Sequence, residues 1–239
     1  MASAQLPLPI SDKPKKKPTW GGAREGAGRK KSGTRSDPLH RMRPTVKRSE
    51  PQHIVLRTVK GLPRLRKGKI YNALRHTVRR MLGDLGFRIV HLSIQHNHLH
   101  LLVEAGTKPA LCRGMQAVAI SAAKQINKVL RRTGKVFAFR YHATAITTPK
   151  QARHALAYVL NNWRRHNEDE RALAARFAAI DQYSSARSFK GWKETELAVM
   201  PRGFRSFEPL EVAPPRTWLL TVGWGKHGLI SAFSTPGLL

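Results

Sequence analysis

The sequence of 239 residues is poor in cysteine and in acidic residues. Cys112 is its only cysteine, and 14 Asp and Glu residues stand against 44 Lys and Arg residues. A single cysteine excludes an intramolecular disulfide and a cysteine-based zinc site, so a metal would need His, Asn, Gln or carboxylate ligands. No stretch approaches the roughly 18 apolar residues of a membrane-spanning helix, and no apolar signal-peptide core follows the N-terminus. We therefore expect a soluble, cytoplasmic protein without a membrane partner.

The excess of cationic residues indicates a polyanionic partner. The net charge is +30 at pH 7, far more than solubility requires, and nucleic acid is the first candidate. Hydrophobic residues make up 41% of the chain, which is enough for a packed core. The sequence thus predicts a folded protein that binds nucleic acid.

The composition divides the chain into three parts. Residues 1–48 are rich in Lys, Arg, Gly, Pro and Ser and predict a flexible basic arm. Mobile cations bind DNA phosphates by releasing counterions, and we favour this role for Arg29, Lys30 and Lys31 over that of a solvated tail. Residues 49–167 carry the regular pattern of a domain, and residues 168–239 form a basic extension.

The domain pattern predicts alternating strands and helices. Strands are expected at 53–59, 87–94, 98–104 and 135–147, and helices at 69–85, 107–133 and from Thr148 onwards. Residues 95–97 between the second and third strands are short enough for a hairpin turn. This order is typical of an α+β, ferredoxin-like sandwich, with helices on one face of an antiparallel sheet and the other face free to hold a site.

The extension is less regular than the domain. Its tryptophans, Trp192, Trp218 and Trp224, suit either a small packed extension or an arm that stacks on nucleic acid. Tryptophans in such segments are more often packing anchors, so we expect each of them to be buried.

Three histidines alternate in the stretch "QHNHLHLLVE", residues 95–104. Residues two apart in a strand point the same way, so His98 and His100 should project together and Leu99 to the opposite side. Two imidazoles at this spacing can share a divalent ion, although two ordinary histidines on a half-exposed sheet would give the same pattern. His96 lies in the expected turn, and we leave it out of the pair.

The helix after Thr148 offers further polar groups. An apolar stripe of Ala152, Leu156, Val159 and Trp163 is predicted to face the core. His154, Tyr158, Asn162 and Arg165 form a polar stripe, in which Asn162 can supply a ligand oxygen and Arg165 can reach a phosphate. Tyr141 is the rival tyrosine, but its alternation with Phe137 and Phe139 favours a packed strand position.

The sequence resembles the HUH single-tyrosine transposases, in particular the REP-associated tyrosine transposases. The similarity lies in "NHLHLLVE", "KVFAFRYHA", "ALAYVLNN", "YSSARSFKGW" and "TWLLTVGWGKHGL", and it extends over residues 50–230. Many relatives follow the tyrosine with Asn-Pro, whereas this chain has Asn161, Asn162 and Trp163. The departure affects the choice of the third ligand more than that of the nucleophile.

The resemblance implies a nuclease and strand transferase, bound to the bacterial nucleoid, that acts on single-stranded or hairpin DNA. Tyr158 would be the nucleophile, and His98, His100 and Asn162 would bind Mg²⁺ or Mn²⁺. Cleavage would leave a 5′-phosphotyrosine and a free 3′-hydroxyl, and relatives work as monomers or homodimers. The alternatives are a replication or conjugation nuclease and a non-catalytic nucleic-acid-binding protein derived from a transposase. Relatives of the first kind often carry a second tyrosine or a helicase extension, and no Gly-rich nucleotide loop supports a helicase extension here.

Overall fold

The computed structural model describes residues 45–84, 86–168, 170, 179–195 and 208–237. Contacts divide the chain into Met1–Arg43 and Pro44–Leu239, and everything below concerns the second unit. Arg29, Lys30 and Lys31 lie outside the described residues, so their predicted contact with DNA stays a prediction.

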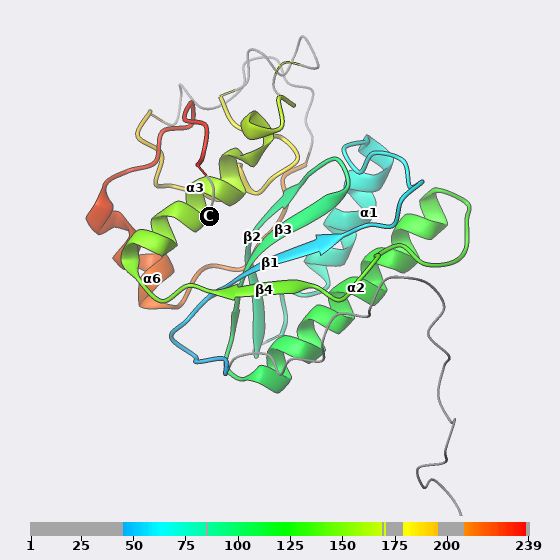
Figure 1. The fold of residues 1–239 in the computed structure, drawn as a ribbon, viewed down its shortest axis with the longest axis horizontal. Helices are drawn as coiled ribbons and strands as arrows, with labels where there is room; N and C mark the ends of the chain where they lie inside the picture. Colours follow the sequence, from blue (N-terminus) through cyan, green and yellow to red (C-terminus); the bar gives the residue numbers. More distant parts are fainter. Residues whose placement is uncertain (1–44, 85, 169, 171–178, 196–207, 238–239) are drawn as a thin grey trace, which may run out of the picture. The chain divides into compact units, whose positions relative to one another are not determined.

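A four-stranded antiparallel sheet forms the centre of the fold (Figure 1). Its strands are β1 (Gln52–Arg57), β2 (Phe87–Ile94), β3 (His98–Ala105) and β4 (His142–Ala145). The strand order is β2-β3-β1-β4, and each neighbouring pair is antiparallel. Helix α1 (Gly68–Arg79) joins β1 to β2, and α2 (Lys108–Val129) joins β3 to β4. This topology confirms the predicted ferredoxin-like sandwich and the hairpin between β2 and β3.

The apolar face of the sheet packs against α1 and α2. Leu99, Leu101 and Val103 alternate along β3 and are almost fully buried in this core. Helix α2 approaches closely at Gly114, where any Cβ would collide with the ring of Phe87. Thr107 caps α2 by accepting a hydrogen bond from the Ala110 N–H, as its position before Pro109 suggests. This face thus forms the main hydrophobic core.

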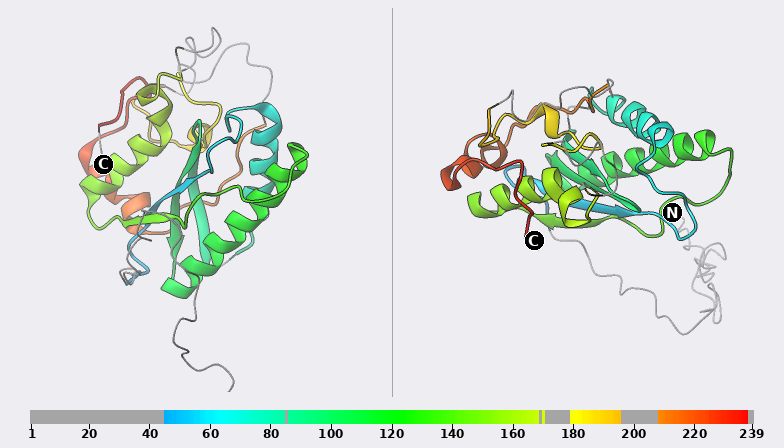
Figure 2. Two further views of the ribbon diagram at one scale, coloured as in Figure 1. Left: turned by 45° about the vertical axis from the view of Figure 1, so that its right-hand side comes forward. Right: turned by 90° about the horizontal axis from the view of Figure 1, so that it is seen from above.

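Helix α3 (Pro149–Arg165) packs on the other face of the sheet, mainly against β2 and β3 (Figure 2). Its predicted apolar stripe is confirmed, because all four members are at most 1% exposed: Ala152, Leu156, Val159 and Trp163. Thr148 accepts a hydrogen bond from the Gln151 N–H, and the Gln151 side chain returns to Thr147. The expectation that this face is free is therefore wrong for the part that α3 covers.

C-terminal residues pack with the apolar stripe of α3 and form a second hydrophobic core. They include the short helices η1 (Ala186–Ser188), α6 (Trp218–Thr221) and η2 (Gly223–His227). The buried carboxylate of Glu104 on β3 binds Arg88 and also accepts from the backbone N–H groups of Arg216 and Thr217. Trp192 is buried at 8% exposure, as predicted, whereas Trp218 is 50% exposed and is not buried as expected.

Two predicted elements are shorter in the structure. Helix α1 ends at Arg79 and is followed by turns. Asp84 then accepts hydrogen bonds from the N–H groups of Gly86 and Phe87 at the entry to β2. The fourth strand begins only at His142, and one isolated bridge, between Thr58 and Phe137, precedes it. The expected alternation fails there, since Phe139 is 68% exposed.

Candidate active site

The two histidines of β3 converge on the face that α3 covers. The Nε2 atoms of His98 and His100 lie 2.9 Å apart. Nδ1 of His98 lies 2.8 Å from the Oδ1 atom of Asn97, which can only accept a hydrogen bond. Nδ1 of His98 is therefore the donor, and its neutral ring carries a lone pair on Nε2, directed at His100.

His53 on β1 joins this pair and was missed in the sequence. Its Nε2 lies 3.1 Å from Nδ1 of His100, and the two rings stack with centroids 5.2 Å apart. When His100 donates from Nδ1 to His53, its Nε2 also becomes a lone-pair donor for a cation. A partner on the far nitrogen commonly fixes the tautomer of a metal-binding histidine in this way. His53 has the same strand parity as Val55, which pairs with His100, and only this pairing of β1 with β3 brings His53 to the site.

Burial keeps the three imidazoles neutral. It lowers the pKa of His53 to about 4, with a further contribution from the charge of His142. It also lowers the pKa of His98 to about 4, with further contributions from His166 and Arg57, and it holds the pKa of His100 well below the usual value. Neutral imidazole is the form that binds a metal ion.

Helix α3 places its polar stripe over the histidines. The half-buried ring of Tyr158 meets His100 edge-on at a centroid distance of 5.2 Å and His53 at 5.7 Å. Two turns further along the helix, His166 meets His98 at 5.6 Å. Asn162 is four residues from each and therefore lies between these two contacts.

The side chain of Asn162 is fully buried. It is 0% exposed, and neither its Oδ1 nor its Nδ2 has a hydrogen-bond partner among the residues that the structure describes. Burying a polar group without a partner costs about 1–3 kcal/mol. An amide without a partner among the described residues, one turn after Tyr158 on α3, fits a side chain that binds a ligand.

The donor set determines which metal site fits. In the described part of the chain, no group of three His, Cys, Asp or Glu side chains is arranged to hold a metal ion. An ion here would be held by Nε2 of His98, Nε2 of His100 and the amide oxygen of Asn162. Nitrogen ligands lie about 2 Å from a bound transition metal, so a separation of about 3 Å between two of them suits one ion. Open coordination positions would remain for a substrate.

The other sequence candidates have different surroundings. Arg165 donates a hydrogen bond to the backbone carbonyl of Pro236. Tyr141 is half-buried against the core under α1 and α2, and its hydroxyl lies 3.7 Å from the sulfur of Cys112. His96 is exposed in the turn before β3. The structure thus brings together His98, His100 and Tyr158, and it adds His53. Asn162 is buried one turn after Tyr158 on the same helix.

Among the described residues, no helix is both long and apolar enough to cross a lipid bilayer.

Residues 49–162 match the family model described as "Transposase IS200 like". A solved structure of a REP-associated tyrosine transposase bound to a REP hairpin is similar over 54% of this chain and 74% of that chain, with 17% sequence identity and a TM-score of 0.43. No curated protein matches the chain. The family match covers β1 through most of α3, including every residue of the site except His166.

Proposed function

Because residues 49–162 match the family model of IS200-like transposases, we propose that this protein cleaves and rejoins single-stranded DNA that contains hairpins, through a 5′-phosphotyrosine intermediate. The observation that carries the proposal is the edge contact of Tyr158 with His100, beside the paired Nε2 atoms of His98 and His100. A nucleophile and a pair of neutral metal ligands are the two parts that this chemistry needs in one place.

Tyr158 is the nucleophile of the proposed reaction. Its hydroxyl oxygen attacks the scissile phosphorus in line, the new Oη–P bond forms, and the bond from phosphorus to the 3′ oxygen breaks. A phenol is largely protonated at neutral pH, so its proton is lost during attack, and the 3′ oxygen takes up a proton as it leaves. The covalent link keeps the phosphodiester energy, so the 3′-hydroxyl of another strand reverses the step without ATP.

His98, His100 and Asn162 are the proposed ligands of Mg²⁺ or Mn²⁺. When bound, the ion would polarise the phosphate and neutralise developing charge. His53 holds the ring of His100 with Nε2 facing the site, and Asn97 does the same for His98. The ligand pair is therefore fixed in orientation before an ion or a strand arrives.

A covalent-adduct assay tests the proposal. The full-length protein is incubated with Mn²⁺ and a single-stranded hairpin oligonucleotide, and the adduct is resolved on a denaturing gel. The label is on the 3′ side of the scissile phosphate, because this part of the strand stays linked to the tyrosine. We expect Tyr158→Phe to abolish the adduct, because the ring remains and only the attacking oxygen is lost. The matched control is Tyr141→Phe, which removes a hydroxyl on the opposite side of the sheet and should retain the adduct.

An adduct that persists in Tyr158→Phe would show that another residue is the nucleophile. Salt-sensitive DNA binding without any adduct in the native sequence would instead favour a non-catalytic nucleic-acid-binding protein.

A further inference from the structure

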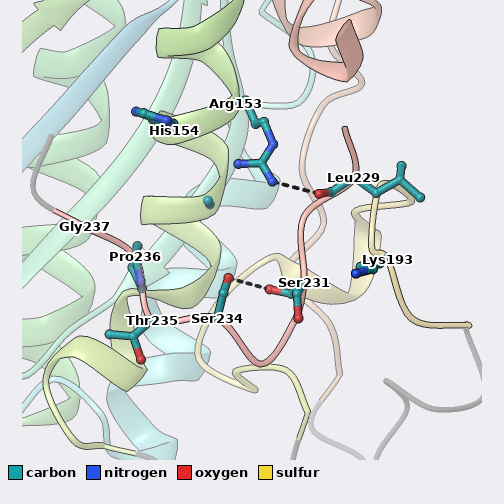
Figure 3. Close-up of a pocket in the computed structure, with 10 residues that line it drawn as sticks. Arg153, His154, Lys193, Leu229, Ser231, Ser234, Thr235, Pro236 and Gly237 are labelled. Atoms are coloured by element: carbon teal, nitrogen blue, oxygen red, sulfur yellow. Dashed lines mark hydrogen bonds between the residues drawn. The ribbon is translucent and has the colours of Figure 1, made fainter. Parts of the chain in front are cut away.

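A polar cavity is lined by α3 and by C-terminal residues. It has a volume of about 440 Å³ and is formed between α3 and the C-terminal segment (Figure 3). Helix α3 contributes Arg153, His154 and Ala157, the segment after η1 contributes Lys193, and most of the remaining wall comes from residues 229–237. Cavities of this size hold small ligands such as a nucleotide.

The wall of this cavity is cationic and rich in hydroxyl groups. Arg153, His154 and Lys193 line it together with Ser231, Ser234 and Thr235, and among the described lining residues none is acidic. The neighbouring Glu194 is directed into the wall, where its carboxylate accepts from the Ser231 hydroxyl at 2.5 Å and from the Ala232 N–H at 2.9 Å. The Ser231 hydroxyl donates to Glu194 and the Ser234 hydroxyl donates to the Ser231 carbonyl, so the cations and Thr235 are the lining groups that can bind phosphate oxygens.

Hydrogen bonds hold the cavity in shape. Arg153 donates through Nε to the carbonyl of Gly228 and through Nη2 to that of Leu229, both at 2.9 Å. These bonds fix the guanidinium and leave its Nη1 group for another acceptor. On the far side, the Asn161 amide donates to the carbonyls of Ser231 and Ser234, at 2.8 and 3.1 Å. The C-terminal loop is thus tied to α3 at both edges of the cavity.

The cavity reaches the polar stripe of α3 that carries Tyr158. His154 lines it and precedes Tyr158 by four residues, so the two side chains are neighbours on one stripe of α3. In Figure 3, His154 and Arg153 point to opposite sides of the helix above the cavity, and Arg153 reaches Leu229. Lys193 and residues 229–237 lie beyond the family match at 49–162, so the cavity is built largely by this chain's own extension.

We propose that this cavity seats one nucleotide of the single strand next to the scissile phosphate, with its phosphodiester bound by Arg153 and Lys193. The proposal rests on the proposed function for the identity of the strand. It assigns the C-terminal extension a share in holding the DNA across Tyr158. Such a contact would act mainly through the backbone and would read little sequence.

Binding measurements without cleavage test this proposal. The affinity of the full-length protein for a short oligo(dT) strand is followed by fluorescence anisotropy over a series of salt concentrations, without divalent metal. Loss of one phosphate contact on a single strand lowers the slope of log K against log salt by about 0.7. We expect this change, and an affinity several-fold weaker, for Lys193→Ala, with a larger loss for Lys193→Glu. The matched control is Lys190→Ala, which removes an equally exposed lysine three residues away, outside the cavity wall.

Competition separates two sources of the phosphate. Inorganic phosphate at matched ionic strength should displace the strand poorly, because a seated nucleotide is held as part of a chain. Displacement that depends on Lys193 and is complete with phosphate alone would overturn the strand assignment. Equal slopes for Lys193→Ala and Lys190→Ala would overturn the cavity as a binding site, and the Tyr158 adduct would still test the proposed function separately.

Discussion

The two faces of β3 carry different kinds of side chain. On one face Leu99, Leu101 and Val103 are buried among the side chains of α1 and α2. On the other face His98 and His100 are buried under α3, and Glu104 fixes the C-terminal segment. Both faces are buried, but only the second carries polar side chains.

The difference shows how one strand supplies both stability and chemistry. Apolar burial on the α1 and α2 side stabilises the sheet at about 25 cal/mol per Å² of buried apolar surface. The polar face costs free energy, because neutral imidazoles and an unpartnered amide are removed from water. A rigid apolar face allows the polar face to keep the orientation that a reaction requires.

Single alanine substitutions on the two faces should separate the contribution to stability from the contribution to chemistry. Leu101→Ala creates a cavity in the main core, and we expect a loss of about 2–5 kcal/mol in the free energy of unfolding. The adjacent change His100→Ala should cost less stability but abolish the adduct and weaken Mn²⁺ binding. Urea unfolding, Mn²⁺ titration and the adduct assay measure these effects. A larger stability loss in His100→Ala than in Leu101→Ala would contradict the division.

Acid should destabilise the protein through its buried histidines, of which His91 on β2 is one. Burial lowers the pKa of His91 from 6.5 to about 4, and its Nδ1 lies 3.0 Å from the Ser185 hydroxyl. Between these values the unfolded chain binds a proton that the folded chain does not. The stabilising effect is therefore complete above pH 6.5 and is lost as the pH falls towards 4, at up to about 1.4 kcal/mol per pH unit.

Urea unfolding across this pH range measures the dependence. We expect a shallower pH dependence for His91→Asn, whose amide can still reach Ser185, than for the native sequence. His227→Asn, at an exposed position, is the control and should keep the native slope. An unchanged slope in His91→Asn would show that this histidine is not responsible.

The sequence predicted the fold and the two main parts of the site because each follows from local periodicity. Alternation in 98–104 placed His98 and His100 together, and helical spacing placed Tyr158 and Asn162 on one stripe. These patterns repeat within one strand or helix, so they can be recognised without knowledge of the tertiary structure. The family match at 49–162 confirms the resemblance read from these motifs.

The missed features depend on contacts between distant segments. His53 reaches His100 only because β1 pairs with β3, and a single histidine in a strand carries no periodic signal. The wall contributed by residues 229–237 depends on loops held by side chains of α3, such as Arg153. The expected strand at 135–147 failed for the opposite reason: its local pattern was apolar, but most of it does not pair with β1.

Two adjacent asparagines on α3 allow the smallest and most specific test. Asn161 and Asn162 are both fully buried, but Asn161 donates to the carbonyls of Ser231 and Ser234, whereas Asn162 has no hydrogen-bond partner among the described residues. We expect Asn161→Leu to lower the free energy of unfolding by about 1–3 kcal/mol, because the carbonyls of Ser231 and Ser234 lose their donor.

Asn162→Leu should leave stability unchanged or raise it by about 1 kcal/mol, since it removes polar atoms that the fold does not satisfy. The same change should weaken Mn²⁺ binding and adduct formation, and Asn162→Asp should restore metal binding by supplying an oxygen ligand. Thermal unfolding and Mn²⁺ titration of the three variants measure both effects. Strong destabilisation by Asn162→Leu with native Mn²⁺ affinity would mean that Asn162 supports the fold. The opposite result would mean that this buried amide serves metal binding and not stability, as we propose for the two histidines of β3.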